Sequence, residues 1–305
     1  MAATIRRLGL SSAWLLVSFI SILPVLGIVA GLWPQESIAF RDIEAFWGYK
    51  SLSVSVAMTL FSAVFSTLIS FYIAFMVFSQ YHLNPRLQSF EKFLAPVLAL
   101  PHLPIALGLV FLFSDGSLFF VDSGLPRKGL STLITAIVVK EVPFFLLILS
   151  AIGRQLPIRN WLLQGRALGY QEHVGWWLLV FPVVLKQSRL ALLAASAYTL
   201  SVVDVSFLVG PNIPELFAVA MYRWQTSFSP GDQSLAFLAN IMLITLLLVS
   251  IVMLYGHEKL LSAACKHCSE LASGLRFGKV NRLFVVWLPL TAVLILLMVA
   301  VFLLF

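Results

Sequence analysis

Charged side chains are scarce in this 305-residue chain. They make up 11% of its residues, whereas soluble domains carry about 25%. Cysteine is scarce as well, and two residues of this type cannot build a disulfide framework. Apolar residues take up 60% of the chain, with 25 phenylalanines and a mean hydropathy of +0.98. This composition excludes a soluble enzyme and a disordered or collagen-like chain, and it predicts an all-α polytopic membrane protein.

Long apolar runs divide the chain into candidate membrane spans. A helix that crosses the bilayer needs about 20 largely apolar residues, because backbone N–H and C=O groups cannot stay unpaired in hydrocarbon. The first run is too long for a signal peptide and ends in no small-residue cleavage motif, so we expect it to remain as an anchor. The seven segments that qualify are 10–33, 52–78, 93–113, 130–152, 190–209, 235–255 and 283–305.

The basic residues indicate how the chain is oriented. Lys and Arg number 20 against 13 Asp and Glu. An excess of this kind could suggest a nucleic-acid partner, but so few charges cannot cover a water-exposed basic face, and we expect no nucleic acid. In membrane proteins Lys and Arg gather in the cytoplasmic connections. With the N-terminus in the cytoplasm, fourteen of them lie on the cytoplasmic side and five on the other, which predicts that orientation.

The connection over residues 154–189 is the most informative stretch. It is too long for a simple turn between helices, which takes about 2–8 residues. Apolar residues such as Trp161 and Leu168 alternate with charged ones, so we expect one or two short amphipathic helices at the cytoplasmic face. Gly165 and Gly169 would let another surface approach the backbone closely. From these residues alone, a helix lying on lipid fits as well as an element that binds a partner.

This stretch resembles the loop shared by the inner-membrane permease subunits of binding-protein-dependent ABC importers. That loop has the pattern E-A-A-x-x-x-G, followed after nine residues by I-x-L-P. Gly169 stands at the glycine position and Pro182 falls thirteen residues later, with Leu179 and Phe181 at the two apolar positions between them. The departure lies at residues 163–165, which read Leu-Gln-Gly instead of Glu-Ala-Ala.

Three further stretches carry the same resemblance. Residues 140–157 (KEVPFFLLILSAIGRQLP) and 197–219 (AYTLSVVDVSFLVGPNIPELFAV) are similar to thiamine-type permeases, in which two permease halves are fused into one chain. Residues 99–113 (ALPHLPIALGLVFLF) fit the third-helix region of thiamine, iron(III), sulfate and molybdate permeases. The resemblance covers about 52–255, and it implies a bacterial inner (plasma) membrane protein.

The resemblance implies a six-span core of the type I importer kind with a seventh span after it. Residues 1–50 would hold the first helix and a periplasmic loop, and 51–256 the permease core with its coupling loop at 154–189. Residues 257–282 would form a basic cytoplasmic linker. Residues 283–305 would form the seventh helix, which we interpret as the possible start of a second permease half in a truncated or split double-length chain.

The resemblance also implies partners. A coupling loop of this family fits into a groove on a cytoplasmic ATP-binding subunit, two of which close around ATP, while a periplasmic solute-binding protein delivers the solute. A second permease half would be fused, separate or a second copy of this chain. The residues that would couple to the ATPase are Gly165, Arg166, Gly169, Glu172 (which could supply the missing acidic contact) and Pro182.

No ATP site is expected in this chain. The stretch 274–280 (GLRFGKV) has the wrong spacing for a phosphate-binding loop and lacks its Ser or Thr. ATP hydrolysis would therefore come from the partner subunit, and the chain itself would not be an enzyme. Cys265 and Cys268, with His267 between them, form half of a zinc-site pattern at most, so we expect two reduced thiols, no metal and no cofactor.

Two adjacent charges lie in the middle of the fourth span. Placing Lys140 or Glu141 in a bilayer costs roughly 2.5–3.5 kcal/mol each on insertion scales, so each needs a cavity or a partner. Neighbouring residues point about 100° apart on a helix, so we expect a separate partner for each on another helix. They either belong to the translocation path or its gate, or form interhelical contacts that fix the packing.

Polar residues in two other spans are further candidates for the path or gate. Ala197, Ser201 and Asp204 would share one helix face, which suits either a water-filled path or a bond to a neighbouring helix. His102 stands between Pro101 and Pro104, in a span that three prolines would break. Its side chain could serve the path or bond a carbonyl freed by proline.

Three functions remain open at this point. The first is the permease subunit of an ATP-driven importer for a small solute, of which a thiamine-like compound is one candidate. The second is a secondary transporter or channel that works alone on an ion gradient, with Lys140, Glu141 and Asp204 as its charges. The third is a membrane scaffold without transport activity.

Overall fold

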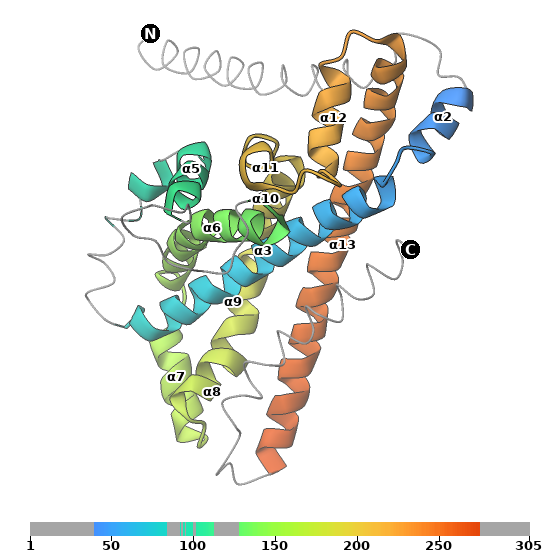
Figure 1. Ribbon diagram of the computed structural model, residues 1–305. Helices are drawn as coiled ribbons and strands as arrows, with labels where there is room; N and C mark the ends of the chain where they lie inside the picture. Colours follow the sequence, from blue (N-terminus) through green and yellow to red (C-terminus); the bar gives the residue numbers. More distant parts are fainter. Residues whose placement is uncertain are drawn as a thin grey trace, which may run out of the picture. The chain divides into compact units, whose positions relative to one another are not determined.

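The computed structural model describes residues 40–83, 92, 94, 96–99, 102–112 and 128–274, with side chains at all of these positions except 102, 112, 230 and 267–274. Within these residues every regular element is a helix (Figure 1). The elements are α2 (Phe40–Trp47), α3 (Leu52–Tyr81), α5 (His102–Leu112), α6 (Leu130–Gly153), α7 (Ile158–Ala167), α8 (Glu172–Gly175), a π-helical turn (Trp176–Val180), α9 (Phe181–Gln187), α10 (Arg189–Ser201), α11 (Asp204–Val209), α12 (Phe217–Gln225) and α13 (Pro230–Gly274).

Several of these helices are long and apolar enough to cross a membrane. Within the described part of the chain they are α3, α6 and the segment Gly231–Lys266 of α13. A fourth candidate is bent, because Glu172–Gln187 and Arg189–Ser201 qualify only together and meet at 62°. The prediction of an all-α polytopic membrane protein is therefore confirmed. The predicted spans at 10–33 and 283–305 lie outside the described residues, so the count of seven stays a prediction.

By compactness the chain divides into two units. The smaller comprises Met1–Tyr49 and Met221–Met242, and its described part is held by aromatic contacts. The Trp224 ring lies 6.1 Å from the ring of Phe46 and 4.9 Å from that of Tyr49, measured between centroids. The larger unit comprises Lys50–Ala220 and Leu243–Phe305, and it contains all of the predicted site residues.

Helices α3 and α6 form the centre of the larger unit. One face of α3 carries small hydroxyl residues at intervals of three or four, and all of them are buried. Their hydroxyl groups bond mainly to carbonyls of α3 itself, so the face stays compact and neighbouring helices can approach closely. These residues are Ser55, Thr59, Ser62, Ser66 and Ser70.

Helices α3 and α6 run in the same direction. At their C-terminal ends, a Cβ atom built on Gly153 would lie 2.6 Å from the ring of Phe78. At their N-terminal ends, the Ser55 hydroxyl donates to the Glu215 carbonyl, and the Gly129 N–H donates to the Val209 carbonyl at 2.9 Å. Neighbouring spans that are parallel must be separated by an odd number of crossings, which agrees with the one span predicted between them at 93–113.

The fifth predicted span is wrong as one continuous helix over 190–209. Helix α10 ends at Ser201, Val202 is extended, and α11 begins at Asp204. The hydroxyl of Ser201 bonds back to the carbonyls of Ala197 and Tyr198, and that of Ser206 donates to the Val202 carbonyl at 2.8 Å. Side-chain bonds of this kind compete with helical ones and satisfy the backbone where the helix breaks.

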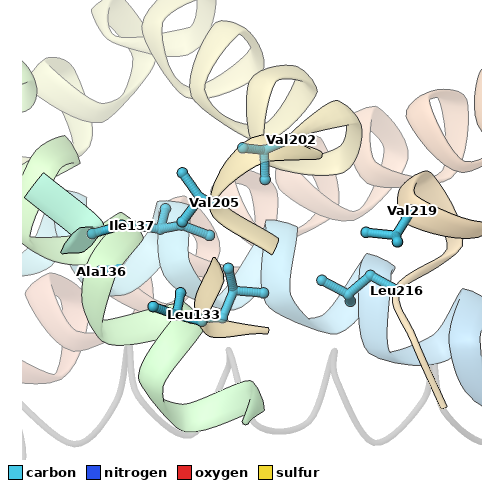
Figure 2. Close-up of a cluster of buried hydrophobic side chains, with 9 residues drawn as sticks. Leu133, Ala136, Ile137, Val202, Val205, Leu216 and Val219 are labelled. Carbon is cyan, nitrogen blue, oxygen red and sulfur yellow. The ribbon is translucent and has the colours of Figure 1, made fainter. Parts of the chain in front are cut away.

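A hydrophobic cluster surrounds this break (Figure 2). It joins α6 to the stretch around α11 and to the first turn of α12, through Leu133, Val205 and Val219. All of its members are buried, Val202 among them, whereas Val203 is half-buried, so protein covers one side of the non-helical residues at 202–203. The remaining members are Ala106, Ala136, Ile137, Val202, Val209 and Leu216.

Candidate functional site

The stretch predicted to be a coupling loop forms a helical hairpin. Helices α7 and α8 lie at one end of the larger unit, and the chain returns from them through α9 (Figure 1). Gly169 lies in the turn with a φ of +89°, a conformation that favours glycine. The Tyr170 N–H donates to the Gly165 carbonyl at 3.0 Å and the Gly169 N–H to the Arg166 carbonyl at 2.9 Å. These two bonds are those of a Schellman motif, so the turn has a defined geometry.

Two glycines of the hairpin allow close packing, and the third allows the backbone turn. A Cβ atom at Gly165 would lie 3.0 Å from Cδ1 of Leu179, and one at Gly175 would lie 3.2 Å from Cδ2 of Leu162. The close approach expected at Gly165 is therefore made by the chain's own next segment. Nothing lies within 4 Å of a Cβ atom at Gly169, so its glycine is required by the backbone conformation.

An ion pair closes the hairpin on its exposed side. The Arg166 guanidinium donates to the Glu172 carboxylate, and the side chains of both are about half exposed. Two of the predicted coupling residues are thus brought together across the turn. The acidic residue that was expected to reach a partner is already neutralised within the hairpin.

Pro182 accounts for an unusual feature at the end of the hairpin. The Phe181 N–H donates to the Trp176 carbonyl five residues back, which makes Trp176–Val180 a π-helical turn. Pro182 has no N–H to donate to the Trp177 carbonyl in the same register. That carbonyl instead accepts from the Cys265 thiol of α13, with the sulfur 3.8 Å from the oxygen.

Aromatic rings anchor the hairpin to α3. The centroid of the Phe75 ring lies 4.7 Å from that of Phe181 and 5.1 Å from that of Trp177, and the Phe78 ring lies 5.8 Å from Trp176. Phe75 and Phe78 are fully buried. Aromatic pairs at these separations add stabilisation beyond their buried area. A displacement of the hairpin would therefore be transmitted to α3.

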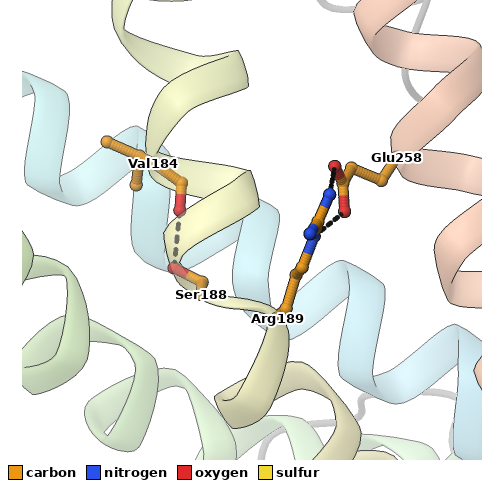
Figure 3. A network of polar contacts seen from close by, with 4 residues as sticks. All are labelled: Val184, Ser188, Arg189 and Glu258. Carbon is orange, nitrogen blue, oxygen red and sulfur yellow. Dashed lines mark hydrogen bonds and ion pairs between the residues drawn. The ribbon is translucent and has the colours of Figure 1, made fainter.

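Helix α13 is tied to the same region by polar contacts. The Tyr72 hydroxyl and Nε2 of His257 lie 2.7 Å apart, and both residues are buried. Arg189, at the bend between α9 and α10, donates from Nε and from one terminal nitrogen to the Glu258 carboxylate, each at 2.5 Å (Figure 3). Ser188, beside it, donates to the Val184 carbonyl at 2.9 Å. The bend is thus fixed from both sides.

A cleft lies between the hairpin and the C-terminal part of α3. Its volume is about 520 Å³. Its walls combine two indole rings with polar groups, among them Glu172, the ion-pair partner of Arg166. The lining residues are Met76, Ser79, Gln80, Glu172, His173, Trp176 and Trp177.

Lys140 bonds backbone carbonyls from the third predicted span. Its ammonium donates to the carbonyls of Val97 at 3.1 Å and Leu98 at 2.9 Å, and its side chain is buried. Pro101 has no N–H with which to pair the Val97 carbonyl four residues before it. Lys140 therefore supplies the donor that proline removes.

Glu141 has a different partner. Its Oε1 accepts from the Thr199 hydroxyl of α10 at 3.1 Å, while its Oε2 is buried without a hydrogen-bond partner among the described residues. The two adjacent charges thus contact different elements, as residues about 100° apart on a helix must.

The other candidates for the path, Ser201, Asp204 and His102, lie on other helices than Lys140 and Glu141. Ser201 and Asp204 are both exposed, but they lie on opposite sides of the break at 202–203. The prediction that Ala197, Ser201 and Asp204 share one helix face assumed a continuous helix, and because the helix breaks after Ser201 this prediction is wrong. His102 begins α5, and its side chain lies outside the described part of the chain. Among the described residues no group of His, Cys, Asp and Glu could hold a metal ion.

Comparison with known proteins gives an independent line of evidence. No protein-family model matches the chain. The chain is 28% identical over 282 residues to the inner membrane ABC transporter permease protein YnjC of Escherichia coli (strain K12). This match covers 88% of the chain and 53% of the relative, so the chain spans about half the length of the relative it matches. The resemblance to ABC transporter permeases is confirmed.

Several contacts of this permease-like chain could not have been found from its sequence. Tyr72 and His257 lie 185 positions apart, and Arg189 and Glu258 lie 69 apart. Neither pair belongs to a motif with a fixed spacing. The sequence indicates in part that the Val97 carbonyl needs another donor, because Pro101 has no N–H to give it. Nothing in the sequence indicates that Lys140 is that donor.

Proposed function

We propose that this chain is the membrane-spanning permease subunit of an ATP-driven importer of a small solute in the bacterial inner membrane. Its N-terminus would lie in the cytoplasm, and the hairpin of α7 and α8 would bind a cytoplasmic ATP-binding subunit that hydrolyses ATP. A second permease half and a periplasmic solute-binding protein would complete the importer. Thiamine-like compounds are one candidate for the solute, given the similarity to thiamine-type permeases.

The observation that carries this proposal is the rigid hairpin at one end of the α3 and α6 pair. Its turn is fixed by a Schellman motif, its two helices are joined by the Arg166–Glu172 ion pair, and its return segment is packed into buried aromatic rings of α3. A loop that transmits force from an ATPase needs such a connection, because a flexible loop would absorb the movement. A helix that only lies on lipid needs none of these contacts.

The break between α10 and α11 supports the proposal of a translocation path. Non-helical backbone at membrane depth is tolerated where it is buried in protein or lines a water-filled cavity. We place Ser201 and Asp204, which are exposed on either side of the break, on the path or its gate. Lys140 and Glu141 would hold the neighbouring helices in position through their bonds to Val97, Leu98 and Thr199.

Deleting residues 164–169 tests the proposed function. The deletion removes the turn of the hairpin, so we expect the purified protein to lose its ATP-binding subunit and solute uptake to stop. A two-residue insertion in the loop at 227–229, on the opposite predicted side, serves as the control and should retain the subunit. The measurement is copurification from membranes together with ATP-dependent uptake in vesicles.

The same experiment addresses the rival functions. A secondary transporter driven by an ion gradient would keep its uptake after the deletion and would depend on Lys140, Glu141 and Asp204. A scaffold would show no uptake before or after it, and neutralising these three residues would change no transport. Wild-type protein that copurifies with no ATP-binding subunit would contradict the importer proposal directly.

A further inference from the structure

Helix α7 has one face that no other described part of the chain covers. Its buried face consists of Ile158, Leu162 and Gly165, which pack toward the returning segment. The adjoining face, about 100° around the helix from the buried one, presents Arg159, Leu163 and Arg166, which are exposed, recur at intervals of four and three and therefore lie side by side. Leu163 is 52% exposed, and Leu168 just beyond the helix is 77% exposed. An apolar centre thus stands between two arginines on a rigid support.

The charged residues on this face of α7, Arg159 and Arg166, are both positive. Between residues 154 and 189 the chain carries five Lys or Arg residues and one acidic residue, Glu172. The carboxylate of Glu172 is already bonded by Arg166. Arg159 is exposed and has no hydrogen bond or ion pair with any described residue. The face therefore offers a net positive charge to whatever binds it.

We infer that this face, Arg159–Leu163–Arg166 with Leu168 at its edge, docks on an acidic surface of the ATP-binding subunit, where an apolar socket receives Leu163. The inference rests on the proposed function and adds the chemistry of the partner. In the loop pattern that this chain resembles, a glutamate stands where Leu163 stands here, which suits a basic partner surface. This chain has no acidic group at that position, and Arg159 and Arg166 lie beside it.

The geometry of the hairpin favours a protein partner over a lipid surface. Both arginines flank Leu163 within one helical turn on each side, so the apolar contact would have a polar rim around it, as the apolar centre of a protein interface has. The Schellman turn and the ion pair hold the three side chains on one rigid element, which suits a shaped socket. Complementary charge around it would guide docking and exclude a wrong partner.

Two substitutions of Leu163 distinguish the two charge patterns. Leu163→Glu restores the residue of the resembling pattern, and Leu163→Lys adds a further positive charge. An acidic partner surface predicts that Leu163→Glu weakens retention of the ATP-binding subunit by about tenfold or more, because like charges would face each other. It also predicts that Leu163→Lys binds more tightly than Leu163→Glu. Arg159→Glu should weaken binding in the same way.

The experiment uses the full chain in nanodiscs made of zwitterionic lipid and the ATP-binding subunit that copurifies with the wild type. The control is Gln187→Glu, which makes the same change of charge at an exposed position away from the face. It should leave binding unchanged. Raising the salt concentration should weaken wild-type binding and reduce the difference between the Leu163 variants, because exposed charges are screened.

Each outcome has a definite meaning. If Leu163→Glu binds as tightly as the wild type or more tightly, the inferred charge pattern is wrong while the importer proposal stands. If the effect of Arg159→Glu occurs only in nanodiscs that contain anionic lipid, the face binds the membrane and the inference is overturned. If no ATP-binding subunit is retained by the wild type, the proposed function fails and the inference with it.

Discussion

Gly153 is a position where a single methyl group is expected to reduce stability. A Cβ atom there would lie 2.6 Å from the Phe78 ring and 2.7 Å from the His82 ring. Phe78 is fully buried against Trp176, so its ring has little room to move. We expect Gly153→Ala to lower the free energy of unfolding by roughly 1–3 kcal/mol, the usual effect of overpacking. Thermal unfolding of the detergent-solubilised protein measures this.

The control for this prediction is Gly256→Ala in α13. Nothing lies within 4 Å of a Cβ atom at that position. Because alanine favours the helix over glycine by about 1 kcal/mol, this variant should be as stable as the wild type or more so. Equal effects of the two substitutions would contradict the close contact at Gly153.

Lys140 is expected to stabilise the third span rather than only to carry a charge. Lys140→Met keeps the length of the side chain but leaves the carbonyls of Val97 and Leu98 without the ammonium. These acceptors are partly buried, and an unsatisfied buried acceptor costs about 1–3 kcal/mol, so we expect a loss of stability toward the lower end of that range. Lys128→Met is the control: its ammonium also donates to a carbonyl, that of Phe207 at 3.1 Å, but at an exposed site where water replaces it. Thermal unfolding of both variants should show a clear loss for Lys140→Met only.

Single residues were recognisable from the sequence, but their partners were not. The sequence singled out Lys140 and Glu141 because charges in an apolar span need partners, and it predicted different partners because neighbours on a helix diverge. The identity of those partners depends on which helices meet. Val97 and Thr199 lie in other predicted spans, and nothing local in the sequence links them to residues 140 and 141.

At the scale of the elements, the long spans were predictable and the breaks were not. Residues 52–78 and 130–152 appear as α3 and α6 because an uninterrupted apolar run has few alternatives to a helix in a membrane. The break at 202–203 contains neither glycine nor proline, so hydropathy runs through it unchanged. It arises from hydroxyl bonds of Ser201 and Ser206 and from packing in the cluster around Val205.

The bend between α9 and α10 should depend on its ion pair with α13. Arg189→Gln removes both bonds to Glu258 and leaves a carboxylate whose side chain is only 9% exposed. We expect this variant to unfold at a lower temperature than the wild type. The charge swap Arg189→Glu with Glu258→Arg should recover part of the loss, because the pair is restored. A double-mutant cycle without coupling between the two positions would contradict the role of this pair.

The turn of the hairpin offers a test of backbone conformation alone. Gly169 has a φ of +89° and open space around it, so a substitution there acts through the backbone. Gly169→Val should weaken retention of the ATP-binding subunit, since a β-branched residue rarely adopts a positive φ. Gly169→Asn should be tolerated better, because asparagine enters this region more readily. Copurification ranks the two variants, and equal retention by both would contradict a strained turn.

At the scale of the whole molecule, the charge distribution and the contacts of α3 agree on which loops lie at opposite ends of that helix. The distribution of Lys and Arg predicts that 154–189 and 210–234 lie on opposite sides of the membrane. The structure places the hairpin beside the C-terminal end of α3, near Phe78, and the stretch around Glu215 beside the N-terminal end of α3, near Ser55. The relative arrangement was thus predictable from the number of crossings. Which side is cytoplasmic rests on the charge bias alone.

Labelling with a membrane-impermeant maleimide tests that orientation. Leu168 and Ile213 are 77% and 93% exposed and lie at opposite ends of α3, so a cysteine at either position should be accessible to reagent on its own side. The background is Cys265→Ser with Cys268→Ser, in which the serine hydroxyl can still donate to the Trp177 carbonyl. The cells lack the ATP-binding subunit, which would otherwise cover Leu168. When they are intact and their outer membrane is permeable to the reagent, Ile213→Cys should react, and Leu168→Cys should react only after the inner membrane is opened. The reverse pattern would invert the orientation and move the hairpin away from any cytoplasmic ATPase, whereas labelling of both in intact cells would contradict the membrane crossing that is predicted between them.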